Sequence, residues 1–141
     1  MKYELTKKSI INNRGIKLFQ IKAIISFGSV IKGELGGYIE LEKNLAQVSG
    51  DAWVSGNAQV FGDARVFGDA WVFGNAWVFG DAWVSGNAQV FGNARVFGDI
   101  KLFMGFFFGI KSKVEKLTFI DLGDKQLIAK GKVKIEISKV P

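Results

Sequence analysis

VSGDAWVSGNAQVFGDARVFGDAWVFGNAWVFGDAWVSGNAQVFGNARVFGDIK occupies residues 48–101 and divides into nine hexapeptides, each beginning with valine. A short fixed period is typical of a stacked solenoid, in which each coil buries its core only against its neighbours. The repeat also decides which side chains stay on the outside, where they are available for function.

Each hexapeptide contains an Ala-x-Val-x strand, and strand side chains alternate between the two faces. Alanine and valine therefore share one face, while Trp, Gln or Arg shares the other with Phe or Ser. Because burying an unpaired arginine such as Arg65 or Arg95 in a narrow core is costly, we expect the alanines and the valines, Val48 to Val96 in steps of six, to face inward.

Glycine followed by Asp or Asn separates the strands, and these residues suit tight corners. Short valine strands joined by such corners predict a three-sided prism with three hexapeptides per coil. Over Ala46–Lys101 the chain resembles the hexapeptide-repeat family of left-handed parallel β-helices. The resemblance implies an all-β fold: a left-handed parallel β-helix of three coils (residues 46–103) with β-hairpin caps at both ends. It does not imply an activity.

Residues eighteen apart stack in this arrangement, which gives three corner columns. An asparagine ladder passes hydrogen bonds along its column, and the aspartates are expected to accept bonds from corner amides rather than to hold a metal ion. The columns are Asp51–Asp69–Asn87, Asn57–Asn75–Asn93 and Asp63–Asp81–Asp99.

The same spacing places aromatic rings on the outer walls of the prism. Stacked rings join neighbouring coils, but two walls of rings exceed the apolar patch that a soluble monomer usually exposes. We therefore expect an interface, most simply between two copies about a two-fold axis. The predicted interface residues are Phe61, Phe79, Phe97 and Trp77 on a first wall and Trp53, Trp71, Phe73 and Phe91 on a second; a third wall is mixed, with Phe67, Arg65, Trp83, Lys101 and Phe103.

Residues 1–45 are predicted to form an N-terminal β cap, since strands at Tyr3–Thr6, Ile10–Ile11 and Ile16–Ile25 flank a turn at residues 12–15. The segments KYELT, IKLFQIKAI and GELGGYIE, followed by GDAWVSGNAQVFG, resemble hexapeptide-repeat proteins common in bacteriophages, prophages and low-GC bacteria. This resemblance implies an origin in a mobile element.

Residues 104–141 do not share that resemblance. Phe103–Ile110 is a strongly apolar run, but it is too short to span a membrane, and it is expected to plug the last coil or join an interface. Lys116–Asp121 and Gln126–Ser138 predict a hairpin, in whose last strand Lys130, Lys132 and Lys134 share one face as a candidate partner-binding surface.

Charge is uneven along the chain. Residues 1–45 hold eight Lys/Arg and four acidic residues, residues 46–99 two and five, and residues 100–141 nine and four. The basic ends leave nucleic acid open as a partner, although lysines on exposed strands also prevent edge pairing. The chain has no cysteine and no apolar leader, so a cytoplasmic location is expected.

Histidine is absent from the chain. The enzymes built on left-handed β-helices rely on histidine, as general base in most acyltransferases and as zinc ligand in carbonic anhydrases. No phosphate-binding glycine loop or serine triad is present either. We therefore expect no catalytic, cofactor or metal site.

Three functions follow from these features. The favoured one is a non-enzymatic interaction protein that forms a homodimer through an aromatic wall and binds a host macromolecule. The phage-like leader makes a bacterial defence protein, such as a CRISPR effector, an expected partner in the host cytoplasm. The alternatives are a hexapeptide-type acyltransferase and a nucleic-acid binder that uses the basic tail.

Overall fold

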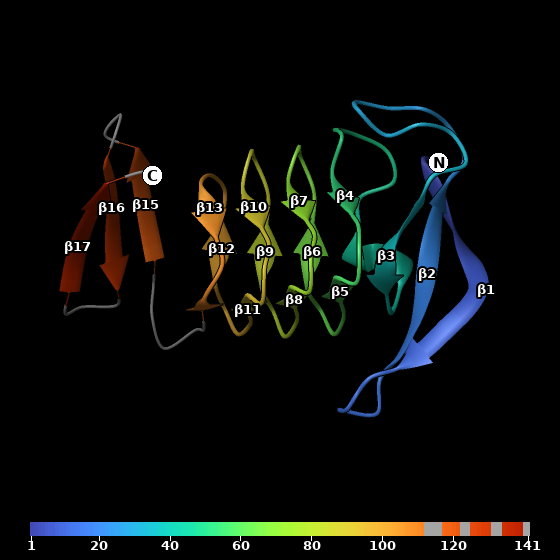
Figure 1. Ribbon diagram of the computed structural model, residues 1–141, viewed down its shortest axis with the longest axis horizontal. Helices are drawn as coiled ribbons and strands as arrows, with labels where there is room; N and C mark the ends of the chain where they lie inside the picture. The colour runs from blue at the N-terminus through green and yellow to red at the C-terminus, as the bar shows by residue number, and fades with distance from the viewer. Residues whose placement is uncertain (112–116, 122–124, 131–133, 140–141) are drawn as a thin grey trace.

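The computed structural model describes residues 1–111, 117–121, 125–130 and 134–139. Within these residues the protein is all-β, as predicted, and holds no α-helix; η1 (Glu42–Asn44) is one turn of 3-10 helix. An N-terminal sheet, a solenoid of stacked parallel strands and a C-terminal sheet follow one another along the long axis (Figure 1).

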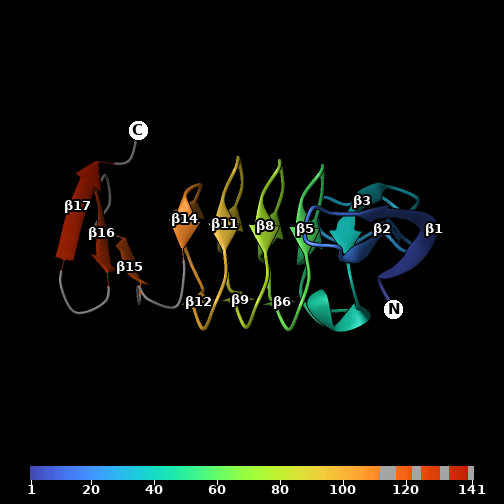
Figure 2. The ribbon, with the colours of Figure 1, turned by 90° about the horizontal axis from the view of Figure 1, so that it is seen from below.

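The solenoid is built from two-residue strands that form three walls. Up to Leu102 each strand of the solenoid pairs in parallel with the strand eighteen residues further along the chain, as in the pairs Trp53↔Trp71 and Arg65↔Trp83, which confirms the predicted coil (Figure 2). The first wall is β5 (Gln59–Val60), β8 (Trp77–Val78), β11 (Arg95–Val96) and β14 (Ile110–Lys111); the second is β4 (Trp53–Val54), β7 (Trp71–Val72), β10 (Gln89–Val90) and β13 (Phe106–Phe107); the third is β6 (Arg65–Val66), β9 (Trp83–Val84) and β12 (Lys101–Leu102).

Alanine and valine fill the lumen, as the repeat predicts. The alanines from Ala52 to Ala94 and the valines from Val54 to Val96 are at most 1% exposed. Backbone bonds of 2.8 to 3.1 Å join successive coils, for example from Ser55 N to Val72 O and from Trp53 N to Ala70 O. The core is therefore one continuous apolar column along the solenoid axis.

Val48 is an exception, and its predicted inward position is wrong. Its side chain is 93% exposed, and Leu45 instead bridges to Val66 and fills the lumen. The chain then loops outward before Gly50 rejoins the corner above Gly68. Gln47 anchors this loop, because its Oε1 accepts hydrogen bonds from the backbone amides of Lys2 and Tyr3 at 2.9 and 3.2 Å.

The solenoid is longer than predicted: it has four stacked coils rather than three. β13 pairs with β10 and β14 with β11, so the coils continue to Lys111 instead of ending at Phe103. Phe107 is 3% exposed and belongs to the core cluster, where its ring occupies the place that valine takes in earlier coils. The apolar run after Phe103 is thus a coil of its own.

Glycine makes the corners of the repeat, and among the described residues no other residue type has a positive φ. At Gly68 (φ 66°) an added Cβ would lie 2.9 Å from the backbone nitrogen of Gly86 in the next coil. The following polar residues bond between coils as expected. Asn57 Nδ2 donates to Asn75 Oδ1 at 3.4 Å, and the Asp51 amide donates to Asp69 Oδ1 at 3.1 Å.

The N-terminal sheet begins with the predicted hairpin. β1 (Tyr3–Ile11) and β2 (Lys17–Ala23) are antiparallel, with an irregularity between Leu5 and Ser9, and the turn between them is closed by a 3.0 Å bond from Gly15 N to Asn12 O. β3 (Leu35–Ile39) pairs with β2 and then, in parallel, with β5 of the solenoid. The hairpin is therefore continuous with the first wall.

Side chains from this segment satisfy the open edge of the first coil. Lys2 Nζ donates to Gly50 O and Ala52 O, both at 3.2 Å, and burial lowers the pKa of this amine although Asp51 and Asp69 oppose the shift. The buried Asn44 donates through Nδ2 to Gly62 O and Ala64 O at 3.1 and 2.9 Å. The carbonyl groups on two sides of the first coil thus have hydrogen-bond donors, although no further coil precedes them to supply backbone amides.

The C-terminal sheet is antiparallel and three-stranded, with β15 (Leu117–Asp121), β16 (Lys125–Lys130) and β17 (Lys134–Lys139). The predicted single strand Gln126–Ser138 is therefore wrong. Lys130 and Lys134 lie on neighbouring strands and pair with each other in register. Lys132 lies outside the described residues.

Val78→Ala should lower the free energy of unfolding by roughly 2 kcal/mol, because it removes two buried methyl groups and leaves a cavity in the lumen. The matched change Val48→Ala should alter it by less than about 0.5 kcal/mol, since that side chain is in water. Urea denaturation measures both. Equal losses for the two variants would contradict the placement of Val48.

Tyr3 makes stability fall at alkaline pH. Its hydroxyl lies 2.6 Å from Leu45 O and 3.0 Å from Glu42 O, and burial, with a smaller effect of the Glu42 carboxylate, raises the pKa of Tyr3 far above its usual value. Because the unfolded chain loses this proton at a pH of about 10, the stabilisation is complete below that pH and is lost progressively above it.

Tyr3→Phe should reduce this alkaline loss in unfolding curves measured from neutral pH upward. It should also cost about 1–3 kcal/mol at neutral pH by leaving a buried carbonyl group unpaired. A variant with the same alkaline slope as the wild type would show that Tyr3 is not the group responsible.

Candidate interaction surfaces on the solenoid walls

The second wall carries a ladder of phenylalanine rings whose last members are exposed. Phe73 and Phe91 stack with centroids 5.2 Å apart, as the eighteen-residue spacing predicts. The ladder continues into the fourth coil, where Phe106 and Phe108 lie 6.4 and 5.8 Å from Phe91. Phe106 is 49% and Phe108 69% exposed, so this end of the wall presents bare aromatic surface.

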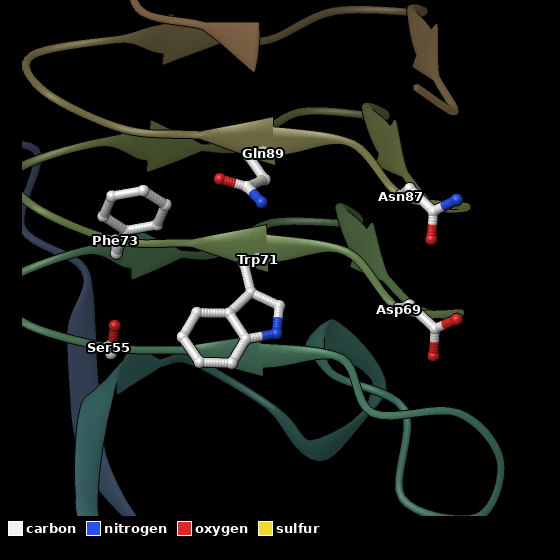
Figure 3. A pocket seen from close by; sticks show the side chains of 6 residues that line it. All are labelled: Ser55, Asp69, Trp71, Phe73, Asn87 and Gln89. Carbon is white, nitrogen blue, oxygen red and sulfur yellow. The ribbon is translucent and has the colours of Figure 1, made fainter. Parts of the chain in front are cut away.

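The opposite end of the same wall is hollowed. A groove of about 450 Å³ is lined by Ser55, Asp69, Trp71, Phe73, Asn87 and Gln89 (Figure 3). It exists because the serine Ser55 takes the ladder position before Phe73, and Gln89 follows Trp71 in the neighbouring column. Large rings on its floor and polar groups at its rim suit an apolar side chain from a partner.

Trp53 does not belong to this surface, and the prediction that it faces outward to a partner is wrong. Its side chain is 0% exposed beneath the N-terminal segment, with Phe27 and Tyr3 at 5.4 and 6.5 Å between ring centroids. Gly36 permits this packing, since an added Cβ would lie 2.8 Å from the indole. The indole Nε1 has no hydrogen-bond partner there.

The first wall is partly covered as well. Phe61, Phe79 and Phe97 form the predicted ladder, with stacking distances of 4.9 and 5.1 Å. Yet Phe61 and Phe79 are only 4% and 8% exposed, because the N-terminal hairpin packs on them through Leu18 and neighbouring residues. The expectation that these two rings face water is therefore wrong: their outer side is occupied by the chain itself.

Two arginines lie on the rings of the first wall. The Arg14 guanidinium is 4.5 Å from the Phe79 ring, and the Arg95 guanidinium is 4.4 Å from the Trp77 ring. Together with Asn13 and Phe97 these four residues line a groove of about 570 Å³. Arg14 has no repeat position, so its place above the wall could not be predicted from the period.

The third wall mixes charges and rings, as predicted. Lys101 Nζ lies 4.6 Å from the Trp83 ring, and Phe67 meets the same indole edge to face at 5.6 Å. At the corner, Lys43 Nζ is 2.5 Å from Asp63 Oδ1. The hydrogen bond and the positive charge of Lys43 lower the pKa of this exposed carboxyl group.

The exposed rings of the fourth coil were not named among the predicted interface residues, although the run Phe103–Ile110 was expected to plug the last coil or to join an interface. Phe106 pairs with Gln89, seventeen residues before it, and Ile110 pairs with Arg95, fifteen residues before it, so the period shortens after Leu102. Phe103 lies above the Gly86 corner, and Gly105, with a φ of 98°, takes the alanine position, since its carbonyl oxygen accepts the bond from Gln89 N as Ala88 O accepts the bond from Trp71 N. The signal in the sequence was the missing corner glycine after Phe103.

In the described part of the chain, no cluster of three or more His, Cys, Asp or Glu residues has the arrangement of a metal site. The described residues also contain no helix with the length and apolar character needed to cross a membrane.

Comparison with protein families supports the solenoid. The model of the YdcK beta solenoid repeat matches residues 46–60, 58–73 and 88–100, all of which lie in the solenoid or in the loop that leads into it. No curated protein matches the chain. The matches and the stacked parallel strands together identify a protein with a β-solenoid repeat, similar over these segments to the YdcK repeat.

Proposed function

We propose that the protein is a non-enzymatic interaction module that forms a homodimer through its second wall. The proposal rests on two complementary features of this one wall, a group of exposed rings and a groove that can receive a ring. Exposed phenylalanines stand at one end of the wall, and a groove with an aromatic floor lies at the other.

A two-fold axis suits these two features. If it lies in the interface parallel to the strands and between Phe73 and Phe91, it reverses the direction of the second solenoid. Phe108 of each copy then faces Ser55 of the other, where the ladder lacks a ring. In such an isologous contact every favourable pair occurs twice.

The size of the surface fits a modest interface. A ring that becomes fully buried contributes about 150–250 Å², and a standard interface buries about 800 Å² on each partner. The partly exposed Trp71, Phe73 and Phe91, with Phe106 and Phe108, supply much of this area on each copy. Aromatic residues are also enriched in the cores of interfaces.

The host partner is the second part of the proposal. A bacterial macromolecule in the host cytoplasm, such as a CRISPR effector or another defence protein, would bind the surface that the dimer leaves free. The support for this part is the resemblance of the leader and repeat to phage and prophage proteins.

Phe108→Ser should convert the dimer to a monomer, because it removes the most exposed ring of the second wall. Light scattering coupled to size-exclusion chromatography measures the mass. Ser55→Phe should have the same effect from the other side of the contact, since the added ring fills the groove. The matched control is Phe103→Ser, a ring at the end of the preceding coil that is 51% exposed at the third wall; it should leave the dimer intact.

Two results would contradict the dimer. One is a wild-type mass equal to that of a single chain at high micromolar concentration. The other is dissociation by Phe103→Ser as strong as that by Phe108→Ser, which would place the contact on the third wall.

A further inference from the structure

The groove on the first wall is cationic and aromatic at once. Its lining residues are Asn13, Arg14, Trp77, Phe79, Arg95 and Phe97, none of them acidic. This wall lies between the corner that carries Asn57 and Asn75 and the corner that carries Asp63 and Asp81, and these aspartates are not among the lining residues of the groove. Phosphate groups would therefore meet positive charge here without a nearby carboxylate among the lining residues.

Arg14 is held over the groove by its own turn. Asn12 Oδ1 accepts hydrogen bonds from the amides of Arg14 and Ile16 at 2.9 and 3.1 Å, and Asn12 Nδ2 donates to Gln59 Oε1 on β5 at 3.1 Å. The turn is thus fixed both internally and to the wall. The guanidinium lies over Phe79, and the residue is exposed to solvent.

Arg95 is held from the other side. Its Nη1 donates to the carbonyl oxygens of Asn75, Asn93 and Ala94 at 3.0, 3.3 and 3.1 Å, while its guanidinium lies on the Trp77 ring. Neither this arginine nor Arg14 forms an ion pair with a carboxylate of the described residues. Two arginines are therefore fixed in place with charge left for a ligand.

We propose that this groove binds a nucleotide unit, either free or within a single strand of nucleic acid. Arginine combines two functions that a nucleotide requires: it donates paired hydrogen bonds to phosphate, and its flat face stacks on a base. Both guanidinium groups already rest on a ring, so a base can stack on their outer faces. Aromatic rings beside a cationic groove are the usual arrangement for single-stranded nucleic acid.

The site is separate from the dimer contact. It uses the first wall and the hairpin turn, whereas the dimer uses the second wall, so a monomeric variant retains the groove. It also differs from the predicted basic-tail site, since its described lining residues belong to the hairpin turn and to the first wall.

The test is fluorescence anisotropy of a labelled oligothymidylate of about ten nucleotides, titrated with the full chain at about 50 and about 200 mM salt. Arg14→Ala and Arg95→Ala should each weaken binding about tenfold and lower the slope of log affinity against log salt by about one. Arg65→Ala is the matched control, because this arginine occupies the same strand position on the third wall; it should leave the affinity unchanged.

Competitors separate the sources of the ligand. AMP and the unlabelled oligonucleotide are compared at equal concentrations of nucleotide. Displacement of the labelled strand by AMP supports a site for a free nucleotide, and displacement by the unlabelled oligonucleotide alone supports a site for a strand. Equal displacement by inorganic phosphate or by a polyglutamate peptide would overturn the proposal, since the groove would then be a simple anion site.

Two further results would overturn it. One is an Arg14→Ala protein, with unfolding temperature unchanged, that binds the oligonucleotide as the wild type does. The other is loss of binding in a Lys130→Ala, Lys134→Ala variant while both arginine variants bind normally, which would assign nucleic acid to the C-terminal sheet. Absence of any binding by AMP and by the oligonucleotide would overturn it as well.

Discussion

The width of the lumen constrains everything else in this molecule. Two-residue strands joined by single-glycine corners enclose a column that alanine and valine fill completely, as their near-zero exposure shows. Trp, Arg and Gln at the neighbouring strand position have no room inside, so they stand on the outer walls at the spacing of the strands. Side-chain size thus separates a uniform interior, which gives stability, from a variable exterior, which is available for recognition.

A stack of coils must end, and the first coil shows how this chain ends it. β3 continues the first wall, and the side chains of Lys2 and Asn44 bond to carbonyl groups on the other two sides. The cost is a buried amine, whose lowered pKa reflects the desolvation of its charge. The same segment covers Trp53 and much of the first ladder, so ending the stack also decides which rings remain outside.

The residues that fill the lumen could be predicted from the repeat, because residue size and the alternation of faces are local properties that recur in every hexapeptide. The residue positions at which the chain departs from the period could not be predicted in this way. Leu45 takes the place of Val48 in the lumen, and Phe107 continues the apolar column of the lumen beyond the last recognisable hexapeptide. The outer surfaces of the walls were more difficult to predict. The burial of Trp53 depends on a segment distant in sequence, and the hairpin turn places Arg14 on a wall although Arg14 lies outside the repeat.

The three walls share one backbone and yet differ in chemistry, because single substitutions within a column change the surface without changing the lumen. Serine at position 55 opens a groove in a ladder of rings, and arginine at position 95 places a cation where the preceding coil has the Trp77 indole. Recognition can therefore change column by column at little cost to folding. This separation is the physical reason that the repeat itself predicts no function: the residues that define the solenoid are inside, and those that select a partner are the ones that the repeat leaves free.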